Sequence, residues 1–250
     1  MQSSDHGVTA VITTHRREPH IVERALRSAL AQTYPHMEIV VVDDSPDDYA
    51  LRGAVADMVR GYEAQGVRYI QHERCMGAGA ARNTGLAQAH GEFIAYLDDD
   101  DEWLPEKTER QAACFTVDDI ALVYCDHETV IEETGQRRIH RNRDVTSQLF
   151  DELMLENFVG STSFPLLRRS ALEAIGGFDE TLESAEDLDV WLSLARFYKF
   201  YHVSDVLAVY HVYSGERITS NPRKVIAGFE RMNEKYRDYI SQNRYVLWKR

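Results

Sequence analysis

Strand-like and helix-like segments alternate through the first 105 residues, and this alternation restricts the fold more than any other feature of the sequence. The strand-like segments are 8–13, 37–44, 67–72 and 92–97, and the helix-like segments lie within 19–33, 49–65 and 77–90. Continuous apolar runs in the strands are typical of parallel strands that are covered on both faces. The spacing fits crossovers through a helix. The sequence therefore predicts an α/β fold with an open, mostly parallel sheet and helices on both faces.

Aspartates follow two of these strands. Asp43 and Asp44 end the second strand, and Asp98–Asp101 follow the fourth. Ligands of open α/β sheets bind outside the carboxyl ends of the strands, so both groups are expected at the ligand-binding edge. Four adjacent like charges are tolerated there if a cation offsets them, and carboxylate oxygens bind Mg²⁺ or Mn²⁺ beside substrate phosphates. The structural alternatives are a solvated acidic loop that caps the helix near Pro105 and an Asx turn at Asp43 and Asp44.

Two further segments contain candidate site residues. Residues 77–85, GAGAARNTG, form a glycine-rich turn before a helix, where backbone N–H groups and Arg82 could face a phosphate. Glu186, Asp187 and Asp189 stand at the start of a later helix, where a carboxylate could act on a reacting centre. The structural alternatives are close packing of small residues in the first segment and favourable acidic charge at a helix start in the second.

Charge and cysteine content exclude several classes of protein. The chain has 250 residues and a formal net charge of −13 at pH 7, which argues against nucleic acid as a partner. The three cysteines are odd in number and lack CxxC spacing, so the sequence predicts neither a disulfide framework nor a zinc site, and reduced thiols in the cytoplasm are the default. No signal-peptide pattern and no window approaching 18 apolar residues is present, so we expect no membrane-spanning helix.

The pattern changes after about residue 118. A strand at 120–126, a hairpin about Gly135, helical pieces, a stronger helix at 185–198, a strand at 207–213 and a terminal amphipathic helix are expected. These elements do not continue the strict alternation of the first part. We therefore expect one continuous domain with two halves, of which the second is smaller.

Four segments in this order resemble the inverting glycosyltransferases of family 2, which have the GT-A fold. They are VTAVITTHRRE, SALAQTYPHMEIVVVDDSPDD, GAGAARNTGLAQAHGEFIAYLDDDDEWLPEK and RRSALEAIGGFDETLESAEDLDVWLSLAR. The resemblance extends over about residues 7–215. It implies a Rossmann-like GT-A domain in residues 1–220, with a nucleotide-sugar half at about 7–117 and an acceptor half at about 118–220. Residues 221–250 would form a C-terminal amphipathic helix and tail.

The resemblance also implies a role for each matching residue. Nucleotide-binding residues would be Thr13, His15, Asp43, Asp44, Arg82, Asp98 and Asp99. Within this set, Asp44 would recognise the base, Arg82 would lie on the diphosphate side and Asp99 would contact the ribose. Asp98 and Asp100 would hold the metal ion, and Asp187 would be the catalytic base. We also expect Asp44 to lie outside the core, so that its replacement by alanine changes the melting temperature little.

One motif departs from the family pattern. Many members have Tyr–Arg–x–His in the last strand, whereas this chain has Tyr210, His211, Val212 and Tyr213. His211 therefore occupies the arginine position and Tyr213 the histidine position. This departure puts a metal or diphosphate contact from this loop in doubt, and His211 or Arg217 could supply it instead.

The implied activity is that of a metal-dependent inverting glycosyltransferase of the hexosyltransferase type. It would move a sugar from a nucleotide-diphosphate sugar, with UDP as the expected nucleotide and Mn²⁺ or Mg²⁺ as the cofactor, in polysaccharide or glycoconjugate synthesis. The acceptor hydroxyl would belong to a carbohydrate or to a lipid-linked or protein-linked molecule. Two alternatives remain: a sugar-phosphate nucleotidyltransferase, although the turn after the first strand, THRREPH, lacks glycine, and a non-catalytic nucleotide- or carbohydrate-binding protein.

The C-terminal segment allows two interpretations. Apolar residues recur at helical spacing in 222–240, and the chain then ends in the locally basic NRYVLWKR. The segment is either a helix packed on the domain with a frayed polar end, or a docking segment for a second subunit or a membrane surface. Peripheral contact at the inner face of the membrane would suit a lipid-linked acceptor.

Overall fold

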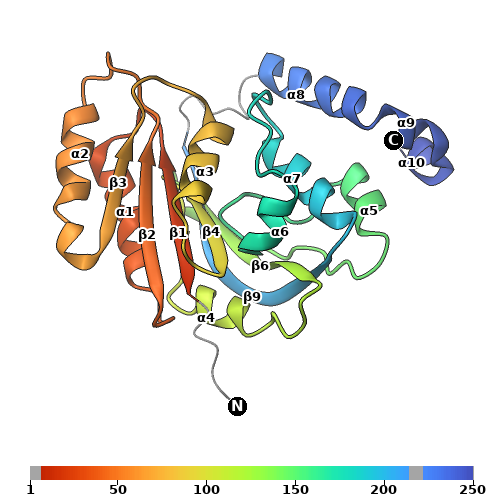
Figure 1. The fold of residues 1–250 in the computed structure, drawn as a ribbon, viewed down its shortest axis with the longest axis horizontal. Helices are drawn as coiled ribbons and strands as arrows, with labels where there is room; N and C mark the ends of the chain where they lie inside the picture. Colours follow the sequence, from red (N-terminus) through yellow and green to blue (C-terminus); the bar gives the residue numbers. More distant parts are fainter. Residues whose placement is uncertain (1–6, 214–221, 250) are drawn as a thin grey trace.

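The first part of the chain forms the predicted parallel sheet. The computed structural model describes residues 7–213 and 222–249 (Figure 1). Its first four strands are β1 (Val8–Thr14), β2 (Met37–Asp43), β3 (Val67–Gln71) and β4 (Phe93–Asp98). They lie in the order β3-β2-β1-β4, and every neighbouring pair is parallel. This order brings the carboxyl ends of β1, β2 and β4 together at one edge.

Alternate side chains of these strands enter two cores on opposite faces of the sheet. Ala10 and Ile12 of β1 pack with helix α1 (Pro19–Leu30) and helix α2 (Arg52–Arg60), and Val11 packs with helix α3 (Ala78–Ala87). Gly85 of α3 lies directly over Val11, and a Cβ there would come within 2.2 Å of the valine side chain. The missing side chain therefore lets α3 approach β1 closely, and the prediction of helices on both faces is confirmed.

The second part of the chain extends the same sheet with mixed pairings. The added strands are β5 (Glu102–Trp103), β6 (Ile120–Ile131), β7 (Gln136–His140), β8 (Leu166–Arg168) and β9 (Lys199–Val212). The order continues β4-β8-β6-β9-β5, with β8 antiparallel to both of its neighbours and β6 parallel to β9. The sequence predicted only the first part of β6 and the last part of β9. The other part of each strand is half-exposed and has no apolar run.

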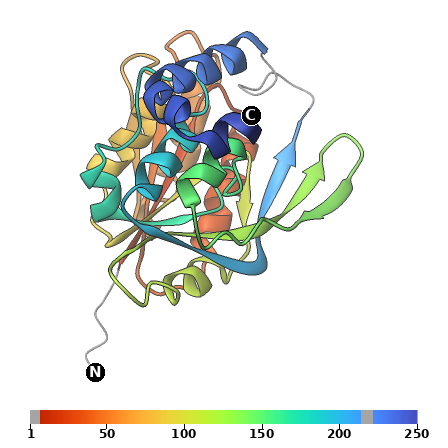
Figure 2. The ribbon, with the colours of Figure 1, turned by 90° about the vertical axis from the view of Figure 1, so that its right-hand side faces the viewer.

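The hairpin about Gly135 is present and projects from the body of the molecule (Figure 2). Gly135 has a φ of +67°, a left-handed conformation that glycine adopts without strain. Four of the five residues of β7 are exposed, and Arg137 on it pairs with Glu128 on β6. The hairpin is therefore held by cross-strand pairs rather than by a core of its own.

The remaining helices lie mostly in the second part of the chain. They are the 3₁₀ turn η1 (Glu63–Gln65) and helices α4 (Lys107–Ala112), α5 (Leu149–Leu155), α6 (Arg169–Ala174), α7 (Glu186–Ala195), α8 (Pro222–Lys235), α9 (Arg237–Gln242) and α10 (Arg244–Lys249). Figure 1 shows the last three beside α5 and α7. The expected terminal helix is thus divided at Tyr236.

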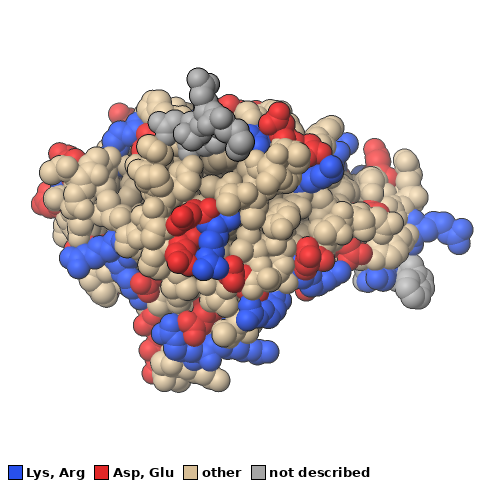
Figure 3. Space-filling model, turned by 90° about the horizontal axis from the view of Figure 1, so that it is seen from below, with Lys and Arg blue, Asp and Glu red and all other residues tan. Residues whose placement is uncertain are grey.

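The C-terminal end is a packed helix and not a frayed segment. Val246 of α10 is fully buried, and the Tyr245 hydroxyl donates to the Glu152 carboxylate of α5 at 2.5 Å. The expectation of a frayed end is therefore wrong for residues 244–249. Among the described residues, no helix is both long and apolar enough to cross a membrane. On the face seen in Figure 3, acidic and basic side chains are interspersed.

Candidate active site

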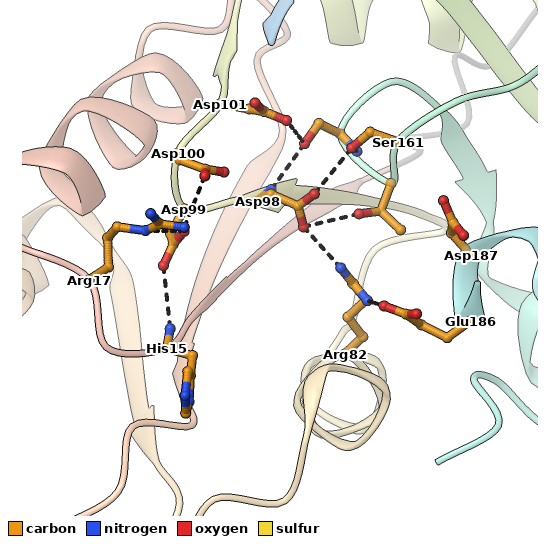
Figure 4. Close-up of polar contacts among 12 residues, drawn as sticks. His15, Arg17, Arg82, Asp98, Asp99, Asp100, Asp101, Ser161, Glu186 and Asp187 are labelled. Carbon is orange, nitrogen blue, oxygen red and sulfur yellow. Dashed lines mark hydrogen bonds and ion pairs between the residues drawn. The ribbon is translucent and has the colours of Figure 1, made fainter. Parts of the chain in front are cut away.

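The Asp98–Asp101 run lies at the end of β4, and each carboxylate has different partners (Figure 4). Asp98 accepts hydrogen bonds from Arg82 at 3.0 Å and from the hydroxyls of Ser161 and Thr162, both at 3.1 Å. The turn that provides these hydroxyls also positions the backbone, because the Asp98 N–H donates to Ser163 Oγ at 3.1 Å. The first aspartate is thus fixed by the loop before β8.

Asp99 and Asp100 share one arginine. Arg17, in the turn after β1, donates to Asp99 Oδ1 and to Asp100 Oδ2, each at 2.9 Å. The His15 backbone N–H donates to Asp99 at 3.3 Å. Burial raises the pKa of Asp99 to about 6 although Arg17 opposes the shift, and the charge of Asp100 adds to it. The two carboxylates are therefore held side by side at the sheet edge.

Asp101 points into the protein. It is fully buried, and it accepts hydrogen bonds from the Ser163 hydroxyl at 2.6 Å and from the His211 backbone N–H at 3.2 Å. Burial, together with the charges of Asp98 and Asp100, raises the pKa of Asp101 well above its usual range. Asp101 therefore connects the loop before β8 to the end of β9, and it is not exposed to a ligand.

Arg82 joins the two parts of the chain across the site. Its guanidinium donates to Asp98 at the end of β4 and to Glu186 at the start of α7, the latter at 2.8 Å. Burial alone would lower the pKa of Arg82, but Asp98 and Glu186 together raise it above its ordinary value. The Glu186 carboxylate is buried as well, so each of these charges relies on the others for neutralisation.

Asp187 follows Glu186 in the first turn of α7. Its carboxylate accepts the Leu188 backbone N–H at 2.7 Å and the Asn157 side-chain amide at 3.4 Å. Burial is the largest cause that raises the pKa of Asp187, to about 7, and the neighbouring Glu186 charge adds to it. A carboxylate with a pKa near neutrality can both accept and release a proton at physiological pH.

The residues predicted to contact the base lie beside this group, at the ends of β1 and β2. Thr13 is in register with Val42 and Asp98, and His15 follows in the next turn. Asp43 forms the Asx turn, since one oxygen accepts the Ser45 N–H at 2.8 Å and the other accepts the Tyr69 hydroxyl at 2.7 Å. The structural alternative for Asp43 is thus present in the structure.

Asp44 organises the loop that leads into α3. One oxygen accepts hydrogen bonds from His72 and from the Met76 N–H, both at 2.7 Å. The other accepts the Gly77 N–H at 2.8 Å. Asp44 is only 3% exposed, so the expectation that it lies outside the core is wrong. Its replacement by alanine would leave the buried His72 ring without this partner, which costs about 1–3 kcal/mol.

His211 lies at the β5–β9 edge, next to the aspartate run. Both of its ring nitrogens face carboxylates, those of Glu102 and Glu132, and the Nε2 distance to Glu102 is 2.7 Å. The His211 imidazole could contact a metal ion or a diphosphate only if one of these carboxylates moved away. The predicted contact of His211 with a metal or diphosphate therefore stays a prediction. Arg217, the other candidate, lies outside the described residues. Tyr213, at the family's histidine position, accepts a hydrogen bond from Arg24 at 2.7 Å.

The residues at the end of β4 fit a hard divalent cation. Asp98 and Asp100 project from the same strand end, and carboxylate oxygens are the ligands that Mg²⁺ and Mn²⁺ prefer (Figure 4). The guanidinium groups of Arg17 and Arg82 pair with the carboxylates of Asp98, Asp99, Asp100 and Glu186, so two cations face four anions here. Arg17 would share Asp100 with the ion.

Several residues of this site were not found from the sequence. Arg17 stands in a turn whose only noted feature is its lack of glycine, and no sequence motif marks Ser161, Thr162 and Ser163. Hydroxyls that accept or donate around a carboxylate have no fixed spacing, so no pattern identifies them. Glu186 was a candidate, but its pairing with Arg82 joins residues 104 apart in the chain, which no local signal predicts.

The fold and the site together define a GT-A glycosyltransferase. The model of the glycosyl transferase family 2 matches residues 9–176, and the chain belongs to this family. The match gives no support to the nucleotidyltransferase alternative. It ends before α7, so Glu186 and Asp187 lie outside the matched residues.

Two similar proteins are bacterial glycosyltransferases. The putative teichuronic acid biosynthesis glycosyltransferase TuaG of Bacillus subtilis is 26% identical over 87% of this chain and 83% of its own length. The Escherichia coli protein WfgD, named as a UDP-Glc:alpha-D-GlcNAc-diphosphoundecaprenol beta-1,3-glucosyltransferase, is 27% identical over 77% of this chain and 71% of its own length.

Solved structures show the same fold. The Staphylococcus aureus TarS fragment 1–349 in complex with UDP-GlcNAc has a TM-score of 0.66 and 25% identity over 86% of this chain and 61% of that chain. The mannosyltransferase PcManGT from Pyrobaculum calidifontis, in complex with GDP-Man and Mn²⁺, has a TM-score of 0.62 and 20% identity over 86% of this chain and 59% of that chain. The chain thus spans only about 60% of these two solved chains.

Proposed function

We propose that this chain transfers a sugar from a UDP-sugar to an acceptor hydroxyl with inversion at the anomeric carbon, and that Asp187 is the general base. The observation that carries the proposal is the environment of Asp187. Its pKa is raised to about 7, and it stands next to Glu186, which Arg82 links to the Asp98 carboxylate. The candidate proton acceptor is therefore adjacent in sequence to a hydrogen-bonded chain of three candidate site residues, Glu186, Arg82 and Asp98.

The reaction follows from these placements. Asp187 accepts the proton of the acceptor hydroxyl as its oxygen attacks the anomeric carbon, and the bond between that carbon and the diphosphate oxygen breaks. The nucleoside diphosphate leaves with the bonding electrons, and a single displacement inverts the configuration. Arg82 and the α3 N-terminus would lie on the side of the diphosphate, where positive charge stabilises the leaving group.

A divalent cation is part of this proposal. Asp98 and Asp100 would hold Mn²⁺ or Mg²⁺, which supplies Lewis-acid stabilisation of the diphosphate charge when bound. TarS has a crystal structure in complex with UDP-GlcNAc, and PcManGT has a solved structure in complex with GDP-Man and Mn²⁺. These complexes support a nucleotide-sugar donor and a metal for this chain.

The acceptor is proposed from the relatives. TuaG is named for teichuronic acid biosynthesis and WfgD for a diphosphoundecaprenol-linked acceptor. We therefore propose a carbohydrate acceptor, free or lipid-linked, in polysaccharide or glycoconjugate synthesis. A lipid-linked acceptor would bring the chain to a membrane surface, where the basic end of α10 is the candidate contact.

A screen of nucleotide-sugars tests the proposal. The purified chain is incubated with Mn²⁺ and each of several UDP-, GDP- and dTDP-sugars, and the release of nucleoside diphosphate is measured. We expect hydrolysis of one or a few UDP-sugars that stops when a chelator removes the metal. Binding of a UDP-sugar without any release would favour the non-catalytic alternative, and release only from other nucleotides would contradict the choice of UDP.

A further inference from the structure

A second group of metal-ligating side chains lies beside the aspartate run. It consists of His15, Asp44 and Cys75, whose imidazole nitrogen, carboxylate oxygen and sulfur all lie within 4.8 Å of one another. The Cys75 sulfur is 3.4 Å from Asp44 Oδ2 and 3.9 Å from His15 Nδ1. A tetrahedral Zn²⁺ ion with bonds of about 2.0–2.3 Å separates its ligands by about 3.3–3.7 Å. The two distances from the Cys75 sulfur are therefore within a few tenths of an ångström of this spacing, and the third pair lies within 4.8 Å.

We propose that His15, Asp44 and Cys75 form a site for Zn²⁺ or a similar thiophilic divalent cation, with a fourth position open to water. One sulfur, one nitrogen and one oxygen ligand favour zinc, whereas Mg²⁺ and Mn²⁺ prefer the all-oxygen set at Asp98 and Asp100. A thiolate and a carboxylate balance the two positive charges of the ion. His15 and Cys75 are exposed, so the ion can enter from solvent.

Asp44 is held ready for this role. His72 and the backbone N–H groups of Met76 and Gly77 fix its carboxylate, and none of them needs to move when an ion binds. Such supporting hydrogen bonds orient metal ligands in established sites. The remaining contact is the Cys75 thiol, which donates to Asp44 Oδ2. The ion would take the place of the thiol proton in that contact.

The protons balance as follows. Without metal the Cys75 thiol donates its proton to Asp44, and it loses this one proton when the sulfur bonds to the ion as a thiolate. The His15 Nδ1 lies 2.9 Å from the Asp44 carbonyl oxygen, to which its proton is donated. Binding through Nδ1 moves that proton to Nε2 without a net loss. One proton is therefore released for each ion bound.

The site overlaps the proposed nucleotide site, because the resemblance assigns the base contact to Asp44. This part of the inference rests on the proposed function. Zinc and the nucleotide would then exclude each other. The ion site itself depends only on the three side chains, and the cysteine spacing in the sequence gave no indication of it.

Cobalt(II) is the probe that tests the site, because thiolate ligation of Co²⁺ produces a charge-transfer absorption that oxygen ligands do not. Reduced, metal-free full-length chain is titrated with Co²⁺ and then with Zn²⁺. We expect one thiolate-bound Co²⁺ per chain, displaced by Zn²⁺. Cys75→Ser should abolish the band, His15→Ala should weaken Co²⁺ binding by more than about tenfold, and the matched control Cys114→Ser should keep it.

Circular dichroism of each variant checks that the fold is retained. Absence of the band in the unmodified chain, or its survival in folded Cys75→Ser, would overturn the proposal. Addition of UDP separates the two parts of the inference. Loss of the band on addition of UDP supports the overlap with the nucleotide site, whereas a band that UDP leaves unchanged overturns the overlap and leaves the metal site standing.

Discussion

At the scale of the residue, the four adjacent aspartates differ in what neutralises them. Asp98 has Arg82 and two hydroxyls, and Asp99 and Asp100 share Arg17. Asp101 is fully buried, and its pKa is raised. The position of the run at a strand end was predictable, because a buried strand precedes it. Its partners come from loops far away in the sequence, and local patterns do not identify them.

Replacement of Asp187 by asparagine tests the general base. Asn keeps the size of the side chain but cannot accept the proton, so we expect transfer to fall by about 10²–10⁴-fold while UDP binding is retained. Rates and UDP dissociation constants are compared with those of Asp57→Asn, an exposed control on α2. Transfer at a rate close to that of the unmodified chain would assign the base to another residue.

The raised pKa of Asp187 also predicts a dependence on pH. Activity should rise with pH and level off above about 7, as Asp187 loses its proton. The free energy of unfolding should instead fall as the pH rises. The folded state binds this proton more tightly than the unfolded state, so Asp187 lowers the free energy of unfolding as pH rises from about 4 to 7.

Denaturant titrations of the unmodified chain and of Asp187→Asn isolate this effect. The variant should gain stability relative to the unmodified chain between pH 4 and pH 7, because its amide does not ionise. A stability difference that is constant over this range would show that the environment of Asp187 does not raise its pKa.

The cation predicted at Asp98 and Asp100 should strengthen nucleotide binding. Calorimetry is expected to give tighter UDP binding with Mn²⁺ than with a chelator, because the ion offsets the repulsion between the diphosphate and the carboxylates. Asp100→Asn should remove most of this difference, and the exposed Asp118→Asn should preserve it. Equal affinity with metal and with chelator would contradict the metal role.

At the scale of the element, α8 and the turn after it hold the start of α7. The Lys235 ammonium and the Tyr236 hydroxyl donate to the two oxygens of buried Asp189, at 2.7 and 2.8 Å. Gly228 lies so close to Ser184 that a Cβ would come within 2.8 Å of its backbone oxygen. The C-terminal helices therefore fix the segment that carries Asp187, although they lie outside the residues that the family model matches.

Tyr236→Phe tests this contact. Loss of the hydroxyl leaves one oxygen of buried Asp189 without its donor, which costs about 1–3 kcal/mol. At about 2–4 °C per kcal/mol, the melting temperature should fall by several degrees. Transfer should fall while the UDP dissociation constant stays unchanged, because Asp189 is two residues from Asp187. Tyr201→Phe, at a half-exposed position, is the control, and an equal effect of both variants would contradict the role of Tyr236.

At the scale of the whole molecule, Arg82 connects the parallel half of the sheet to the half that carries α7. Arg82→Met leaves the buried Glu186 and the half-buried Asp98 without their cation, and removing one partner of a buried ion pair costs about 3–5 kcal/mol. Denaturant unfolding should show this loss. The double variant Arg82→Met with Glu186→Gln should be more stable than Arg82→Met alone, and a double variant of equal or lower stability would contradict the charge explanation.

The sequence predicted the parallel half well, because each buried strand is an apolar run and a helix-like segment separates each strand from the next. It predicted the second half poorly. β9 has fourteen residues, and its first part, including Tyr201 and His202, has no apolar run that marks a strand. The helical state of α10 also escaped prediction, since it depends on the packing of Val246 and the Tyr245 contact with Glu152.

The separate partners of Asp98–Asp101 have a consequence for the gene. Four aspartate codons in a row form a near-repeat at which replication can slip, and a loss of one codon would hardly change the composition of the protein. In the folded chain, however, the deletion of one aspartate would have one of two effects. It would either place Glu102 at the fully buried position of Asp101 or shift the register of β5 against Val209 and Ala208. Each position of this repetitive run is therefore constrained separately by the fold. Natural variants should keep the length of the run even where they change its residues.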